Sequence, residues 1–396
     1  MRLRPERFVA GGDALARDED GRIVFVRGAV PGDDIEVTVM EEHGDWARGV
    51  IETIHDASAD RVAPPCRRRL EGCGGCDWQH VVESAQLPAK VAIVVDALRR
   101  TGKLEDAVVH AAGSVPAGGY RTTIRVVGDA DGRASYRMDR SNDTVLASGC
   151  LVAHPALVDM LDALVVPPGV EVTLRVSVAT GEATALWDDT AGVVAGLPSH
   201  VATGPAAALT EVVAGQRLRV SAPSFFQSGP AAAELLVDRV MRAAPELGDA
   251  RRVLDAYAGV GLFAAAATQP ESQVVAVESS RSAVADCAVN LHDRRARIER
   301  RQVGDWRPKR GEMFDVVIAD PARTGLAKPG TRALAAAAAP VLVLVSCDPV
   351  SLARDATLLR QHGYRHETTD VIDLFPGTHH VEAVTRFTLR DRARAD

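Results

Sequence analysis

The feature that most constrains the fold is a repeated strand-helix alternation after about residue 223. Short apolar runs rich in Val, Leu, Ile and Ala each give way to a stretch with helical spacing. The runs are RRVLDA, QVVAVE, FDVVIAD, PVLVLVS and VEAVTRF. Repeated βα units favour a doubly wound, mostly parallel sheet, in which ligands bind at the carboxyl ends of the strands. We therefore predict an α/β domain over residues 223–396, with its chemistry at these strand ends.

One thiol stands at such a strand end. Cys347 follows the apolar run at residues 341–345, and Asp348-Pro349 separates it from a segment with helical leucine spacing. This position faces a cleft in an open α/β sheet, where a thiol can act as a nucleophile. The ordinary alternative is a small buried residue, because free cysteine is among the most buried types.

A glycine turn at the first strand of this domain predicts a nucleoside site. VLDAYAGVGLFA ends the strand near Asp255 and turns through Gly259 and Gly261 into a helix, while Glu278 ends the next strand and can accept two ribose hydroxyls. The first glycine of a full dinucleotide fingerprint is missing, and Asp255 would repel a pyrophosphate. S-adenosylmethionine, which has no phosphate and carries a sulfonium, therefore fits better than NAD; a purely structural turn is the alternative.

Further polar residues are expected at the same edge. Asp320 ends the fourth strand, in VVIADPARTG, and Asp305 in VGDW is placed to contact an adenine. Glu382 begins the last strand, where a carboxylate can act as a base, although a lone glutamate is usually solvated. Gln227, in SFFQSG, offers a two-sided amide beside two aromatic rings, with core packing as the alternative.

The N-terminal half predicts two other units. Residues 1–58 alternate apolar and polar positions between turns, a pattern that favours a small β-barrel. From residue 59 the chain becomes rich in Cys, Gly and Arg without periodicity, and a helix over residues 88–100 and a β-rich stretch over residues 120–187 follow. We predict domains at 1–58, 59–222 and 223–396.

Four cysteines of the second unit form a candidate metal site. These are Cys66, Cys73, Cys76 and Cys150. No apolar run reaches the roughly 18 residues of a membrane span and no signal peptide is evident, so we expect a cytoplasmic protein, in which clustered cysteines bind metal rather than form disulfides. Spacing alone does not choose between Zn and a [4Fe-4S] cluster.

Taken together, the motifs resemble those of the RNA uracil-5-methyltransferases over almost the whole chain. FFQSG, DAYAGVGLF, DPARTGL, SCDPVSLARD and FPGTHHVEAV occur in that family's order and with similar spacing. FVAGGDALARDEDGRIVFVRGAVPGD resembles its TRAM domain, an OB-like RNA-binding barrel. CRRRLEGCGGCDWQH with GCLVAHP resembles its iron-sulfur segment. The resemblance implies a Rossmann-like methyltransferase domain, an N-terminal TRAM barrel and a β-rich central iron-sulfur domain.

The resemblance also implies roles. Cys347 would add to uracil C6 and Glu382 would remove the C5 proton after methyl transfer. Gln227 would position the nucleobase or the methyl group. The residues implied to hold S-adenosylmethionine are Tyr257, Gly259, Gly261, Glu278, Asp305 and Asp320. The four cysteines would hold a [4Fe-4S] cluster, with one more residue between the first two than the family usually has.

The expected product is 5-methyluridine in structured RNA, with 23S rRNA as the substrate and tRNA as the alternative. A 5-methylcytosine enzyme would use a similar thiolate addition, but those enzymes usually carry a second cysteine, and Cys287 lies on a helix pattern. A non-catalytic RNA-binding iron-sulfur protein is the alternative of another class. Departures from the family at Ala258, Ala322 and Ser228-Gly229 bear on packing and RNA specificity. We expect a monomer.

Overall fold

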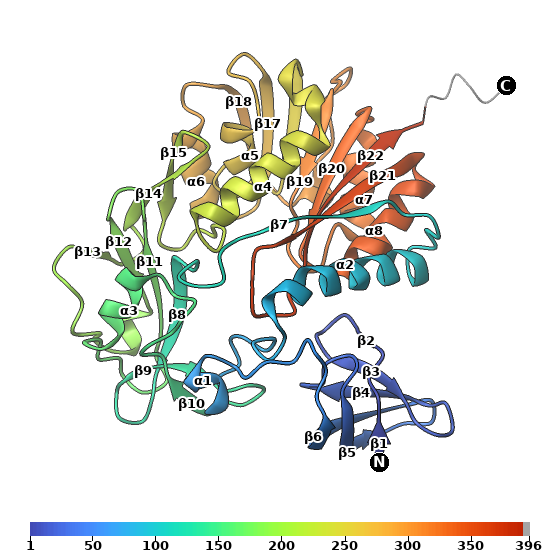
Figure 1. Cartoon of the computed structure of the whole chain (residues 1–396). Helices are drawn as coiled ribbons and strands as arrows, with labels where there is room; N and C mark the ends of the chain where they lie inside the picture. Colours follow the sequence, from blue (N-terminus) through green and yellow to red (C-terminus); the bar gives the residue numbers. More distant parts are fainter. Residues whose placement is uncertain (391–396) are drawn as a thin grey trace.

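The computed structural model describes residues 1–390, so the last six residues of the predicted third domain lie outside it. Within these residues the strands form four sheets: an N-terminal sheet, a central sheet, the two-stranded sheet of β14 (Ala208–Val213) and β15 (Gln216–Ser221), and a large sheet built mostly from the C-terminal part (Figure 1). No helix within residues 1–390 is long and apolar enough to cross a membrane.

The large sheet has eight strands in the order β18-β17-β16-β19-β20-β22-β21-β7. Its strands are β7 (Val109–Ser114), β16 (Arg252–Ala256), β17 (Gln273–Glu278), β18 (Arg295–Arg300), β19 (Val316–Ala319), β20 (Val341–Ser346), β21 (Tyr364–Asp373) and β22 (Glu382–Leu389). The five strands from β18 to β20 are parallel, whereas β22 runs antiparallel to both β20 and β21. The predicted α/β fold is confirmed, and the sheet is mixed.

Helices cover both faces of this sheet, which explains why its central strands are apolar on both sides. The helices are α2 (Glu83–Arg100), α4 (Pro230–Ala243), α5 (Leu262–Ala266), α6 (Arg281–Asn290), α7 (Ala327–Ala336) and α8 (Pro349–Gln361). Val343 and Val345 pack in one core with α4, α5 and α6. Leu342 and Leu344 pack in another with α2, α7 and α8. The single strand β20 thus supplies both cores by alternation.

Two elements of the large sheet come from the segment predicted as the central domain. β7 pairs in parallel with β21, and α2 packs against α8. Helix α2 begins at Glu83, five residues before the predicted start at Pro88. The proline lies inside the helix at an exposed position. The predicted boundary at residue 223 therefore does not separate the strands of this sheet.

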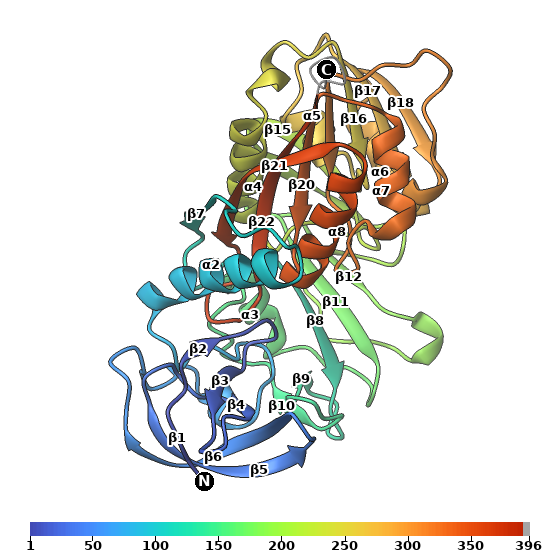
Figure 2. The ribbon, with the colours of Figure 1, turned by 90° about the vertical axis from the view of Figure 1, so that its right-hand side faces the viewer.

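The N-terminal sheet has the order β1-β5-β6-β4-β3-β2. Its strands are β1 (Arg2–Leu3), β2 (Arg7–Phe8), β3 (Ala14–Arg17), β4 (Ile23–Arg27), β5 (Asp34–Glu42) and β6 (Trp46–Asp56). Its core includes Trp78 and Val81 from the following segment and Ile93 from α2. Helix α2 lies between this sheet and the large sheet in both views (Figure 1, Figure 2). The N-terminal unit is thereby fixed beside the large sheet.

The central sheet has the order β10-β9-β8-β11-β12-β13. Its strands are β8 (Thr123–Gly128), β9 (Ala134–Arg137), β10 (Thr144–Leu146), β11 (Glu171–Val176), β12 (Ala183–Leu186) and β13 (Val201–Thr203). The remaining elements of this region are α1 (Arg67–Leu70), α3 (Pro155–Leu161) and the hairpin of β14 (Ala208–Val213) and β15 (Gln216–Ser221). Three short 3₁₀ turns, η1 (Asp189–Ala191), η2 (Pro245–Gly248) and η3 (Val303–Asp305), complete the described elements.

Candidate active site

The predicted residues at the strand ends meet at one edge of the large sheet. Asp255 is the penultimate residue of β16, and Glu278 ends β17. Asp320 and Cys347 directly follow β19 and β20. These four strands are parallel neighbours, so their carboxyl ends share an edge. Glu382 reaches the same edge in another way: it begins β22, which runs antiparallel to β20.

The register places Cys347 and Glu382 opposite each other. Ser346 pairs with Ala383, and continuing this antiparallel register by one residue sets Cys347 against Glu382. Directly opposed residues on antiparallel strands have Cα atoms about 4.5–5.5 Å apart. Burial, followed by the charges of Glu382 and Asp320, raises the pKa of the Cys347 thiol to about 12. The thiol and the carboxyl group are therefore electrostatic neighbours.

Three carboxyl groups at this edge lack a cationic partner. Asp255 and Glu382 are buried and Asp320 is half-buried, and among the described residues no basic side chain forms an ion pair with any of them. Burial and then the charges of Asp320 and Glu278 raise the pKa of Asp255 to about 7, and burial does the same for Asp320. Burial and the charge of Asp320 also raise the pKa of Glu382. Such a site favours a bound cation.

Asp255 shows this imbalance most clearly. Its Oδ2 accepts a hydrogen bond of 2.9 Å from the Ala264 amide in α5, whereas its Oδ1 is buried without a partner among residues 1–390. An ionised carboxylate with one unsatisfied oxygen is costly in such an environment. The group is therefore poised to change its protonation near neutral pH.

The glycine turn lies beside the half-buried Glu278 carboxylate. Glu278 Oε2 accepts from the Gly259 amide at 3.0 Å, and its Oε1 accepts from the Ser279 and Ser280 amides at 2.7 Å. A Cβ at Gly259 would meet nothing within 4 Å, so a ligand can approach the backbone there. At Gly261, φ is +89° and a Cβ would lie 3.1 Å from Cys287 Sγ, which requires glycine. The Oε2 atom, with one donor, keeps a lone pair for a ribose hydroxyl.

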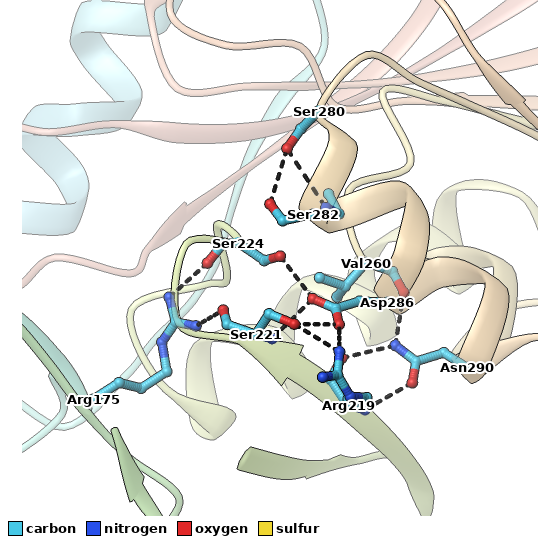
Figure 3. A network of polar contacts seen from close by, with 10 residues as sticks. Arg175, Arg219, Ser221, Ser224, Val260, Ser280, Ser282, Asp286 and Asn290 are labelled. Atoms are coloured by element: carbon cyan, nitrogen blue, oxygen red, sulfur yellow. Dashed lines mark hydrogen bonds and ion pairs between the residues drawn. The ribbon is translucent and has the colours of Figure 1, made fainter. Parts of the chain in front are cut away.

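Gln227 contacts the edge of the large sheet, and a network outside the sheet holds the loop before it. Its Nε2 donates to Asp320 Oδ2 at 3.4 Å. The preceding Ser224 donates through Oγ to Asp286 of α6 at 2.6 Å, and its carbonyl accepts from Arg175 at 2.8 Å (Figure 3). The network fixes the loop before Gln227, while the intervening Phe225 remains 75% exposed.

Two other predicted residues lie around this edge. Tyr257 follows β16 with a positive φ of 63°, and its Oη would lie 2.6 Å from a Cβ placed on Gly330 of α7. Asp305 lies on η3 with an exposed side chain.

The structure also brings in residues whose roles were not predicted. Arg323 follows β19 and its Nη2 lies 2.8 Å from His380 Nδ1, beside Cys347 in a cavity of about 200 Å³. Burial, together with the charges of His379 and Arg323, lowers the pKa of His380 to about 4, so its ring is neutral at pH 7. Asp77, the residue after Cys76, forms an ion pair with His379. Its position beside a cysteine was the only sequence signal.

The four predicted cysteines line a single cavity of about 470 Å³ between α1 and the central sheet. Cys76 is buried and the other three are half-buried. Within residues 1–390 no group of three His, Cys, Asp or Glu side chains is arranged to hold one metal ion.

Comparison with solved structures defines the class: this mixed α/β sheet is a methyltransferase fold. The crystal structure of the Pyrococcus abyssi tRNA (uracil-54, C5)-methyltransferase in complex with S-adenosyl-L-homocysteine has this fold, with a TM-score of 0.73, 22% identity, and coverage of 98% of this chain and 100% of that one. No protein-family model matches the chain.

Curated relatives identify the family. An uncharacterized RNA methyltransferase of Streptomyces avermitilis is 34% identical, over 94% of each chain. The 23S rRNA (uracil(1939)-C(5))-methyltransferase of Methylococcus capsulatus is 31% identical, over 96% of this chain and 95% of its own. The protein therefore belongs to the RNA methyltransferase family and is an enzyme of that family.

Proposed function

We propose that this enzyme methylates C5 of a uridine in structured RNA, with S-adenosylmethionine as methyl donor. The observation that carries the proposal is the opposed pair of Cys347 and Glu382 beside buried carboxyl groups without a cationic partner. The Methylococcus relative, named for uracil C5 of 23S rRNA, supports 23S rRNA as the substrate.

The carboxyl groups support a sulfonium donor. A positive sulfur near Asp320 and Glu382 would favour the ionised forms of these carboxyl groups. It would also stabilise the Cys347 thiolate, which burial and these two carboxylates disfavour. Glu278 would bind the ribose, and Gly259 and Gly261 would let the nucleoside approach the backbone. Tyr257 and Asp305 are proposed to flank the adenine, and Asp320 and Gln227 to face the reacting methyl group.

The proposed reaction uses the two opposed side chains in sequence. Uracil C5 is too weak a nucleophile to take a methyl group unaided, so the Cys347 thiolate first bonds to C6 and the C5–C6 π electrons move onto O4. The resulting enolate attacks the sulfonium methyl group through C5, which releases S-adenosylhomocysteine. Glu382 then takes the C5 proton, the double bond reforms, and the bond from Sγ to C6 breaks.

A row of cavities supports a path for RNA toward Cys347. The cavity beside Cys347 and a second of about 220 Å³ share the lining residues Gly11, His379 and His380. The second cavity shares Arg69 and Arg140 with the cavity of the four cysteines. We propose that the row carries the RNA backbone, with the target uridine flipped out of its stack to reach Cys347.

The charge along this row supports phosphate binding. Arg27, Arg69 and Arg140 come from the N-terminal sheet, α1 and the β9–β10 connection, and all three line the second cavity. Arg27 forms an ion pair with Asp139 of the same cavity, and burial and the charges of Arg140 and Arg69 lower its pKa. Arg69 and Arg140 form no ion pair among residues 1–390, so an RNA phosphate could bind between them. The N-terminal sheet, proposed as a TRAM barrel, would thus contact RNA.

The four cysteines are proposed to hold a [4Fe-4S] cluster. Four thiols around one space suit a cluster with a thiolate on each iron better than they suit a single ion. The cluster would tie α1 to the central sheet beside the arginines. Protein purified without oxygen should contain iron at about four atoms per chain; zinc without iron would exclude the cluster.

Covalent trapping tests the reaction. RNA containing 5-fluorouracil should form an adduct with the wild type, because a fluorine at C5 cannot be removed as a proton is, and Cys347→Ala should form none. Glu382→Gln should accumulate an adduct with ordinary RNA. An adduct in Cys347→Ala, or rapid turnover by Glu382→Gln, would refute the assigned roles.

Nucleoside mapping identifies the substrate. Loss of 5-methyluridine from 23S rRNA in a strain without the gene is the expected result. Loss from tRNA, or loss of 5-methylcytosine, would support those alternatives, and unchanged rRNA and tRNA would refute the proposed substrate.

A further inference from the structure

The loop that leads into Glu382 is fastened by a segment of the chain that is distant in sequence. This loop, residues 374–381, joins β21 to β22 and places His380 and Val381 in the cavity beside Cys347. The fastening residues belong to positions 77–90, which begin directly after Cys76. We call residues 77–90 the strap.

A buried ion pair holds the start of the loop. Lys90 of α2 is fully buried, and its Nζ lies 2.6 Å from Asp373 Oδ1 and 3.3 Å from the Phe375 carbonyl. Asp373 Oδ1 also accepts from the Phe375 amide at 2.9 Å. Because an unpaired charge cannot stay in this environment, Asp373 is confined to one position.

Two further contacts hold the middle of the loop. The Gly377 amide donates to Gln86 Oε1 at 2.7 Å, and the Gly377 carbonyl accepts from the Trp78 amide at 2.8 Å. Gln86 is 4% exposed and is itself fixed by a bond of 2.9 Å from its Nε2 to the Val81 carbonyl. Both backbone polar groups of Gly377 are thus satisfied by the strap.

The last contact lies three residues before Glu382. The His379 amide donates to Asp77 Oδ1 at 3.1 Å, and the His379 ring forms an ion pair with the same carboxylate. A Cβ placed on Gly12 would lie 2.8 Å from His379 Cβ and 3.1 Å from Asp77 Oδ2, so the β2–β3 connection packs against this contact. The loop is therefore held at its start, its middle and its end.

We infer that the strap positions Glu382 for proton removal, with Asp77 and Gln86 as positioning residues. This inference rests on the proposed function of Glu382 as the base. Pairing with β20 and β21 fixes the backbone of Glu382 along the strand, while the strap fixes the direction from which the chain enters it. Proton removal is sensitive to such placement, because a shift of about 1 Å can slow a step 100-fold. Thiolate addition depends on β20 and should not share this sensitivity.

The test separates the two steps. Asp77→Ala and Gln86→Met remove the acceptors for the His379 and Gly377 amides, whereas Asp77→Asn keeps an oxygen for His379 and serves as the matched control. Elimination is followed by release of tritium from [5-³H]uridine RNA and by the fraction of covalent adduct on denaturing gels. Addition and methyl transfer are followed by the rate of adduct formation with 5-fluorouracil RNA. Iron content is measured for each variant, since Asp77 adjoins Cys76.

At saturating RNA, Asp77→Ala and Gln86→Met should slow tritium release about 10- to 100-fold and accumulate adduct, with an unchanged trapping rate and iron content. Asp77→Asn should recover most of the release rate. Normal release in both Asp77→Ala and Gln86→Met, or an equal loss of release and trapping, would overturn the inference. Glu382→Gln keeps the two proposals apart, because its failure to accumulate adduct would refute the base and not the strap contacts.

Discussion

The free energy of unfolding of ligand-free Asp255→Asn, taken relative to that of the wild type, should increase as the pH rises from 5 to 8. The wild-type carboxyl group has its pKa raised from 3.8 to about 7 by burial and by nearby negative charge. Between these two values the folded state binds more protons than the unfolded state, so the wild type loses stability as pH rises, and the loss is complete above about pH 7. An asparagine does not titrate and should not show this loss.

The size of the effect follows from the interval. The pKa of Asp255 in the folded state lies about two units above pH 5, and each unit corresponds to about 1.4 kcal/mol. The free energy of unfolding of Asp255→Asn relative to wild type should therefore rise by about 3 kcal/mol. The asparagine amide would also lie unpaired where Oδ1 is now, which costs about 1–3 kcal/mol at every pH. That constant cost cancels when the difference at pH 5 is subtracted from the difference at pH 8.

Thermal unfolding at four pH values between 5 and 8 provides the measurement. Hydrogen exchange of β16 amides gives a local readout, since a chain with several separate sheets need not unfold in one step. Asp293→Asn, at an aspartate whose side chain is 68% exposed, is the matched control and should show no such trend. S-adenosylmethionine should reduce the pH dependence of the wild type more than neutral S-adenosylhomocysteine does. An Asp255→Asn difference that is equal at pH 5 and pH 8 would refute the reasoning.

Two variants test the proposed RNA path and cluster. Arg140→Ala should reduce the slope of the logarithm of the RNA binding constant against the logarithm of salt concentration by about 0.7 to 0.9, the value of one phosphate contact. The control Arg332→Ala, at an exposed arginine of α7, should leave this slope unchanged. Equal slopes for Arg140→Ala and the wild type would exclude a phosphate contact at Arg140. Cys150→Ser should lower the iron content of anaerobically purified protein, because Cys150 lines the cavity of the four cysteines. The control Cys287→Ala should leave the iron content unchanged, because Cys287 is buried in α6. Unchanged iron in Cys150→Ser would show that Cys150 is not a ligand.

The strands of the large sheet could be predicted because each carries its own signal. β20 is apolar from Val341 to Val345 and buried at every position, and the residues that follow it break the strand locally. The position of β7 could not be predicted in this way. Its sequence, VHAAGS, has no long apolar run, and it joins the sheet through a pairing with β21 more than 250 residues away. Only tertiary contacts decide such a pairing, and they carry no local pattern.

The same distinction holds at the site. Asp320 and Cys347 could be placed at one edge from their strand ends alone, since parallel neighbours share that edge. The contact of Asp77 with His379 joins positions 302 residues apart, and nothing in the residues around Asp77 indicates it. The packing of α2 against the large sheet could not be predicted for the same reason.

The antiparallel insertion of β22 explains how the base and the nucleophile can meet. In a wholly parallel sheet the first residue of a strand lies at the edge opposite the ligand site, so Glu382 would be remote from Cys347. Reversing β22 brings its first residue to the carboxyl end of β20. The reversal also requires a hairpin loop that crosses this edge, directly over the cavity beside Cys347. A loop in that place needs support from outside the sheet, and the strap is the segment that supplies it.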